Sequence, residues 1–167
     1  MKFFKSNAKI RTAILVPLFV LLGPTAAFSA SPGRIAAEAA ADIAANRMEK
    51  ECQTETGRSK LRRKAGYKRA TNLGEDRWVV VVDSEKLACT HAGACGTGGC
   101  QISVISQVTG QTKTIYTEQA RGWKLIKPKV GATFIRLDVH GSHCGKAGAA
   151  ECYERLDLTT GATSISR

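Results

Sequence analysis

The chain has 167 residues, 43% of them hydrophobic, and a formal net charge of +11 at pH 7. This composition excludes a disordered or fibrous protein, and the length fits one globular domain. The excess of cations predicts partners that are anionic or neutral.

Residues 1–29 have the pattern of a signal peptide. Four cations, Lys2, Lys5, Lys9 and Arg11, precede the apolar stretch Thr12–Gly23, and small residues follow it. Because this stretch is shorter than the ~20 residues that span a bilayer, we expect cleavage, with an uncleaved anchor as the alternative. No further transmembrane segment is expected in the mature chain, whose net charge is +7 once the four cations are subtracted from +11.

The signal peptide predicts a location in the periplasm or outside the cell. Nucleic acid is not the expected anion there, whereas phospholipid headgroups, lipopolysaccharide, peptidoglycan and acidic proteins are nearby. The expected partner is therefore an anionic envelope component or a protein.

Six cysteines follow the signal peptide: Cys52, Cys89, Cys95, Cys100, Cys144 and Cys152. An even number of cysteines in a small exported chain indicates a disulfide framework. Six cysteines allow fifteen connectivities, and the sequence alone does not choose among them. The preferred set is Cys95 with Cys100, Cys144 with Cys152 and Cys52 with Cys89, because the first two close short loops and leave the last two as partners.

The first predicted element is an alanine-rich helix from about Pro32 to Glu51. Ser31 can cap it and Pro32 suits its first position. Ile35, Ala39 and Ile43, continued by Arg47 or Met48, follow helical spacing and predict a thin apolar face. Since alanine buries little surface, we expect the helix to lie flat on a sheet.

Residues 53–77 show no clear period, but they contain a basic cluster. Its members are Arg58, Lys60, Arg62, Arg63, Lys64, Lys68 and Arg69. The cluster is either a solvated loop or an anion-binding patch.

From Trp78 onward the sequence predicts strands. Trp78–Val82 is a continuous β-branched run, typical of a strand that is covered on both faces and lies at the centre of a sheet. Further strand-like runs follow at 101–108, 112–117, 123–127, 133–139, 153–158 and 162–165.

The predicted fold class is α+β: an N-terminal alanine-rich helix packed on a six- to seven-stranded antiparallel sheet, a meander, with disulfide-closed loops. Residues 1–29 are the predicted signal peptide, 30–77 the helix and basic connecting segment, and 78–167 the β region of the same single domain.

The pattern His-x-x-x-Cys-Gly occurs twice, at 91–96 and at 140–145. Each copy continues with glycines, a second cysteine and a strand-like run that ends in Thr-Gly, so the chain contains two versions of one loop-and-hairpin unit. Loops closed by disulfides suit recognition, because the cross-link lowers the ordering cost of binding.

All three histidines, His91, His140 and His143, lie within four residues of a cysteine. This clustering supports an alternative function as a periplasmic protein that binds Zn or Cu, with Asp83, Asp138 and Glu151 as further ligand candidates. His140 and His143 would point to opposite faces of a strand, so convergence needs a turn at Gly141–Ser142. The leading hypothesis requires no cofactor.

Catalytic signatures are weak. Cys144 beside His143, or Cys95 near His91, would need a free thiol, which the even cysteine count argues against. Ser142, His140 and Asp138 lack the Gly-x-Ser-x-Gly turn of a hydrolase nucleophile. The chain is therefore not expected to be an enzyme, although a site assembled from residues distant in sequence stays possible.

Several segments carry a resemblance: Val79–Asp83, the Cys95-Gly96-Thr97-Gly98-Gly99-Cys100 loop, Ala120–Trp123, and Leu137–Gly145 followed by Gly148 and Cys152. Together they resemble a group of small, mostly uncharacterised exported proteobacterial proteins. The resemblance implies export and a compact disulfide-bonded domain, and no activity. The segment 34–77 lies outside it.

The Cys-x4-Cys spacing also resembles that of periplasmic lysozyme inhibitors, in which a short disulfide loop plugs the enzyme. A net charge of +7 would repel a cationic lysozyme, so this hypothesis is secondary. The leading hypothesis is an exported, disulfide-stabilised binding protein of the bacterial envelope. It would recognise an anionic surface or a protein partner through the paired loops and the segment 58–69.

Overall fold

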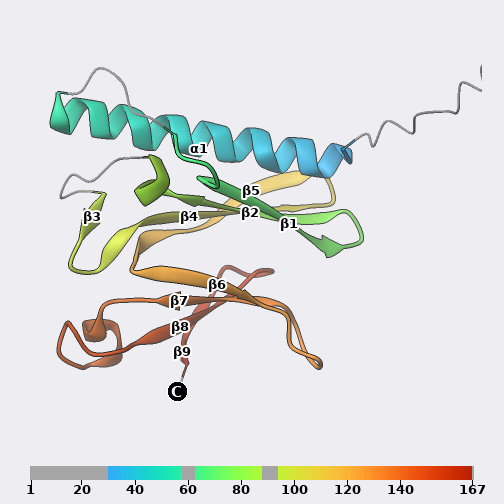
Figure 1. Cartoon of the computed structure of the whole chain (residues 1–167). Coiled ribbons are helices and arrows are strands. Elements are labelled where there is room, and N and C mark those ends of the chain that lie inside the picture. Colours follow the sequence, from blue (N-terminus) through green and yellow to red (C-terminus); the bar gives the residue numbers. More distant parts are fainter. Residues whose placement is uncertain (1–29, 58–62, 88–93, 167) are drawn as a thin grey trace, which may run out of the picture.

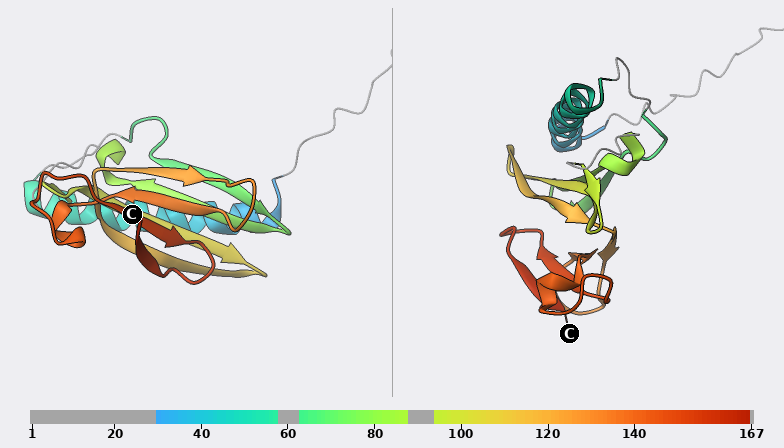
Figure 2. Two further views of the ribbon diagram at one scale, coloured as in Figure 1. Left: turned by 90° about the horizontal axis from the view of Figure 1, so that it is seen from below. Right: turned by 90° about the vertical axis from the view of Figure 1, so that its left-hand side faces the viewer.

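The structure, a computed structural model, describes residues 30–57, 63–87 and 94–166. These residues form three stacked layers, a helix, a first antiparallel sheet and a second antiparallel sheet (Figure 1). The end-on view at the right of Figure 2 shows the first sheet between the helix and the second sheet. The predicted α+β class, with a helix on antiparallel strands and disulfide-closed loops, is confirmed.

Helix α1 (Pro32–Thr56) starts where the sequence predicts and runs five residues further. The Ser31 hydroxyl accepts a hydrogen bond from the Arg34 backbone N–H at 3.3 Å. Gly57 ends the helix with a left-handed φ of 67°, and its N–H donates to the Gln53 carbonyl at 2.9 Å. Glycine is the usual residue for this conformation because it has no Cβ.

The buried face of α1 consists mostly of small side chains, with Met48 as the one large member among the described residues. Ala37, Ala41, Ala45, Met48 and Cys52 are buried against the first sheet. Their spacing of three or four residues places them on one side of the helix.

The predicted apolar face is wrong at Ile35 and Ile43, which are 59% and 64% exposed, whereas Met48, one of its two possible continuations, is buried. Close approach explains the choice of alanine: a Cβ at Gly33 would lie 2.6 Å from Asp76 Oδ1, so the helix end nearly touches the sheet. An isoleucine face would hold the helix away from the sheet.

The first sheet has five strands in the order β1-β2-β4, with β3 and β5 also paired to β4. They are β1 (Lys68–Gly74), β2 (Arg77–Asp83), β3 (Cys95–Gly96), β4 (Gly99–Val108) and β5 (Gln111–Ala120), with the short helix η1 (Ser84–Leu87) after β2. β1 lies in the segment 53–77, where the sequence predicts no element. It pairs with β2 through a tight turn in which Glu75 and Asp76 have φ values of 47° and 53°.

The valine run of β2 is buried on both faces, as predicted. Val79 and Val81 pack toward the second sheet, whereas Val80 and Val82 pack toward α1. Because neighbouring side chains of a strand point to opposite faces, a strand in the middle layer needs apolar residues at every position.

The second sheet has four strands in chain order. They are β6 (Gly122–Ile126), β7 (Phe134–Asp138), β8 (Tyr153–Asp157) and β9 (Thr163–Ser166), with the short helix η2 (Gly141–Cys144) between β7 and β8. Ile135, Leu137 and Leu156 are fully buried against the first sheet. The strands from β4 to β9 overlap the predicted runs.

The chain passes from one sheet to the other at Arg121, between β5 and β6. Two sheets therefore replace a continuous meander, and their inner faces form the larger of two hydrophobic clusters. Gly99 lies against this crossover with a φ of 103°, and a Cβ there would lie 2.1 Å from the Ala120 carbonyl carbon. The sequence reveals the strands but not the point where the chain changes sheet.

Candidate functional site

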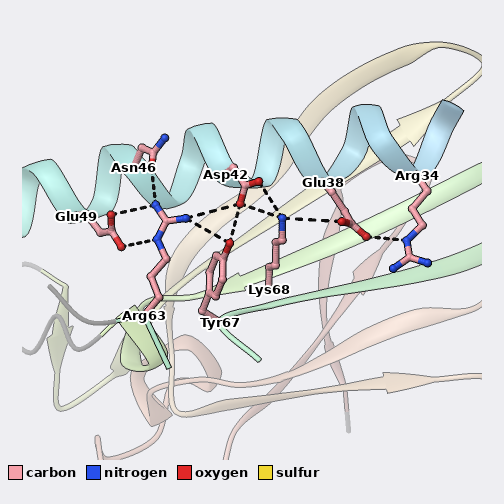
Figure 3. A network of polar contacts seen from close by, with 8 residues as sticks. All are labelled: Arg34, Glu38, Asp42, Asn46, Glu49, Arg63, Tyr67 and Lys68. Atoms are coloured by element: carbon pink, nitrogen blue, oxygen red, sulfur yellow. Dashed lines mark hydrogen bonds and ion pairs between the residues drawn. The ribbon is translucent and has the colours of Figure 1, made fainter. Parts of the chain in front are cut away.

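The predicted basic cluster contains residues with different roles. Arg58, Lys60 and Arg62 lie outside the described residues. Arg63 and Lys68 point toward acidic side chains of α1 (Figure 3). Lys64 and Arg69 are exposed. The anion-binding prediction therefore has to be considered residue by residue.

Arg63, in the segment before β1, and Lys68, the first residue of β1, both pair with acidic side chains of α1. Arg63 donates to both carboxylate oxygens of Glu49, at 2.7 and 3.0 Å, and to Asn46. Lys68 Nζ lies 2.9 Å from each carboxylate oxygen of Asp42. Since each cation has an acidic partner, these two side chains hold the helix and offer little charge to a ligand.

The pKa values in this network agree with tight pairing. Burial alone would raise the pKa of Asp42, but hydrogen bonds from Lys68 and from the Tyr67 hydroxyl, at 2.8 Å, lower it overall. Burial would lower the pKa of Lys68, and the Asp42 hydrogen bond raises it overall. The Glu49 hydrogen bond raises the pKa of Arg63. The charged forms are thus favoured in the folded protein.

A basic groove of about 590 Å³ lies between β1, η1 and β6. Four cations line it: Arg69, Lys86, Lys124 and Lys127. Trp123 lines it too, partly buried against the core, with the Arg69 guanidinium 5.9 Å from its ring. The backbone N–H of Lys64 donates to the Lys86 carbonyl at 2.7 Å, which brings a fifth cation close.

Asp83 is the one acidic residue among the described residues that line the groove. Burial raises its pKa, while the Glu85 N–H, which donates to Asp83 Oδ1 at 3.0 Å, opposes that effect. With Asp83 ionised, four cations and one carboxylate give the groove a net charge of +3. Cations gathered in a groove concentrate their field and raise the local concentration of anions.

Lys86, Lys124, Lys127 and Trp123 were missed by the sequence analysis. Lys86 lies on η1, Trp123 and Lys124 lie on β6, and Lys127 directly follows β6, all distant in sequence from the predicted cluster. The one available signal was the basic stretch 124–129, which has three lysines and no acid.

The disulfide predictions are confirmed where the structure describes them. Cys95 is bonded to Cys100 and Cys144 to Cys152. Cys52 is also disulfide-bonded, whereas Cys89, its predicted partner, lies outside the described residues.

Arg121 links the two disulfide-closed loops. Its guanidinium donates to the carbonyls of Thr97 at 3.3 Å, Ala149 at 3.5 Å, and Gly148. Thr97 belongs to the first loop and the other two to the second. The disulfide-closed loops of the two repeated units therefore lie side by side at the crossover between the sheets.

The histidines have separate partners. His91 lies outside the described residues. His140 caps η2, with Nδ1 2.7 Å from Ser142 Oγ, and His143 Nδ1 lies 2.9 Å from Glu154 Oε1. Within the described ranges, no three His, Cys, Asp or Glu side chains lie close enough together to hold a metal ion. The metal site that includes His91 stays a prediction.

Comparison with family models, curated proteins and solved structures finds no match to this chain. In the parts of the chain that the structure describes, no helix has the length and hydrophobicity needed to cross a membrane. The basic groove and the joined loops are therefore the features from which a function can be inferred.

Proposed function

We propose that the chain is an exported, disulfide-stabilised protein of the bacterial envelope that binds an anionic envelope component in the basic groove. The observation that carries the proposal is the set of four cations around Trp123, with Asp83 as the single acid among the described lining residues. The predicted signal peptide and the disulfides favour an oxidising compartment.

The groove suits an anionic group attached to a ring. Its volume of about 590 Å³ falls in the usual range for small-ligand sites. Lysine ammonium groups attract phosphates and carboxylates as point charges, and a tryptophan ring offers an apolar surface to a sugar. A phosphorylated glycan headgroup, such as that of lipopolysaccharide, combines both features.

The test compares two double variants that each lose two positive charges. Lys124→Gln with Lys127→Gln changes the groove, and Lys50→Gln with Lys113→Gln removes two exposed cations elsewhere. Each groove cation is expected to contribute about 0.5–1 kcal/mol, so the groove variant should bind about tenfold more weakly. The control should stay within about twofold, because charges on other elements are screened at physiological salt.

Binding is measured by sedimentation with lipopolysaccharide vesicles, anionic phospholipid vesicles and peptidoglycan, at low and physiological salt. A preference for one component identifies the ligand. Equal losses in the two double variants would show that only net charge matters, and absence of binding to all three at low salt would also refute the proposal.

A further inference from the structure

The second sheet is the outermost of the three described layers, so one of its faces is turned away from the other two (right view of Figure 2). Ile135, Leu137 and Leu156 are fully buried on the inner face, and the residues beside them in the strands therefore point outward. β7 and β8 share one pattern, aromatic-x-Arg-Leu-Asp, at Phe134–Asp138 and Tyr153–Asp157. Each strand thus presents an aromatic ring, an arginine and an aspartate on the outer face.

Three cations form a row across this outer face. Lys124 on β6 is paired in register with Arg136 on β7, which is paired in turn with Arg155 on β8. All three side chains are exposed. Since neighbouring strands lie about 4.8 Å apart, the row is about 10 Å long. Like charges directly opposite each other weaken a sheet, so an anion that lies along the row would relieve this repulsion.

The acids of the outer face flank the row without pairing to it. Asp138 lies in register on one side of the row and Asp157 on the other. Among the described residues, no ion pair joins an acid to any of the three cations. Asp157 Oδ1 accepts hydrogen bonds from the backbone N–H groups of Thr159 and Thr160, each at 2.8 Å. The positive charge is therefore a narrow line rather than a broad patch.

Each arginine of the row stacks on the aromatic ring of the other strand. The Arg155 guanidinium carbon lies 4.3 Å from the centre of the Phe134 ring, and that of Arg136 lies 4.6 Å from the centre of the Tyr153 ring. A guanidinium presents a planar fork of donors that matches carboxylate, sulfate and phosphate groups. Because the arginines occupy the rings, the rings are poor platforms for the bases of a nucleic acid.

The row continues into the basic groove, because Lys124 belongs to both. In the groove Lys124 is joined by Arg69, Lys86 and Lys127. A line of positive charge therefore runs from the groove over β6 and β7 to Arg155 on β8. A flat anionic membrane laid on this face would meet the two flanking aspartates, whereas a narrow chain can follow the cations between them.

We infer that the groove and the row together bind one linear acidic glycan, a polymer with an anionic group on each repeating unit. The inference rests on the proposed function, because the groove holds one part of the chain beside Trp123. Arg136 and Arg155 bind acidic groups further along the same chain. The predicted export favours a glycan over a nucleic acid.

The experiment is isothermal titration calorimetry of the mature, oxidised protein at low salt. The probes are a trimer and a hexamer of galacturonic acid, which carry carboxylates, and a heparin hexasaccharide, which also carries sulfates. We expect the hexamer to bind at least about tenfold more tightly than the trimer, because it reaches two further cations. The tighter of the two hexasaccharides identifies the preferred acidic group.

Double variants locate the additional contacts. Arg136→Gln with Arg155→Gln should weaken hexamer binding about tenfold and change trimer binding less than about twofold. Arg136→Lys with Arg155→Lys keeps both charges and should stay within about threefold of the wild type. Circular dichroism checks that both variants are folded.

The matched variants are those that test the groove. Lys124→Gln with Lys127→Gln should weaken both the trimer and the hexamer, because both ligands occupy the groove. Lys50→Gln with Lys113→Gln, which removes two exposed cations on other elements, should change neither affinity by more than about twofold.

Two results would overturn the inference and leave the groove proposal intact: equal affinity for trimer and hexamer, or unchanged hexamer affinity in the Arg→Gln double variant. Unchanged affinity in the groove variant, with a loss in the arginine variant, would instead refute the proposed function. Absence of hexasaccharide binding at low salt would overturn the inference. Tighter binding of single-stranded DNA of equal charge, or of anionic phospholipid vesicles, would overturn the assignment to a glycan.

Discussion

Ala41 and Ile43 are two residues apart on α1, and replacing each of them tests which face of the helix is buried. Ala41 is fully buried against the first sheet, in the cluster with Val80, Val82 and Ile105. Ala41→Leu inserts three carbon atoms into this packed layer, which should cost about 1–3 kcal/mol of unfolding free energy.

Ile43→Ala should be nearly neutral. Ile43 is 64% exposed, so about a third of the ~1.5–3 kcal/mol available from its full burial is at stake, which is less than about 1 kcal/mol. Alanine regains about 0.4 kcal/mol through its better helix propensity. The net cost should therefore be below about 0.6 kcal/mol.

The two unfolding free energies are measured by urea denaturation at 25 °C with circular dichroism, with unchanged m-values as the check on two-state behaviour. If the isoleucine face were buried, Ile43→Ala would cost about 2–5 kcal/mol and Ala41→Leu would be neutral. That reversed order would refute the three-layer packing described above.

Three further predictions concern charges and a disulfide. The folded-state pKa of Asp42 is lowered, so the stability that its carboxylate contributes is present above 3.8 and is lost as the pH falls through the lower folded value. Asp42→Asn should destabilise by about 1 kcal/mol at pH 7, allowing for solvent screening, and its difference from the wild type in urea midpoint should shrink as the pH falls below 3.8. The pKa of Asp83 is raised in the folded protein, so its ionised carboxylate lowers stability at pH 7. Asp83→Asn keeps the acceptor for the Glu85 N–H and should raise both the urea midpoint and the anion affinity at pH 7, and the gain in stability should vanish as the pH falls toward 3.8. A loss of anion affinity in this variant would contradict the groove assignment. Replacing Cys144 and Cys152 together by serine should lower the free energy of unfolding by about 2–3 kcal/mol and speed backbone amide hydrogen exchange at residues 146–151. Unchanged exchange would mean that Arg121 alone orders the loop.

The sequence predicts the elements whose signals are local. The valine run of β2 and the alternating residues of β7 are buried strands, and the two short disulfides link cysteines five and eight residues apart. β1 has no such signal, because its sequence Lys-Arg-Ala-Thr-Asn-Leu-Gly is mostly polar. Pairing with β2 stabilises it, together with the contact between Lys68 and Asp42 on α1.

The candidate site is less predictable, because it depends on which distant residues meet. The run of positive charges in the sequence does not distinguish Arg63 and Lys68 from Arg69. In the structure the first two lie against acidic side chains of α1, whereas Arg69 lies against Trp123. Lys124 joins Arg69 only because β6 lies beside β1 in the folded protein. The pattern of a single sequence does not indicate which side chains from different layers come into contact.

In the part of the chain that the structure describes, the hydrogen bonds from the Arg121 guanidinium to the two loops all go to backbone oxygens. Every amino acid supplies a carbonyl, so the side chains at Thr97 and Ala149, which are exposed, can change without loss of this link. Gly148 is constrained for a different reason, since a Cβ there would lie 2.3 Å from His140 Nε2. The domain is therefore a frame on which loop chemistry can diversify, by evolution or by design, while the positions of the loops stay the same.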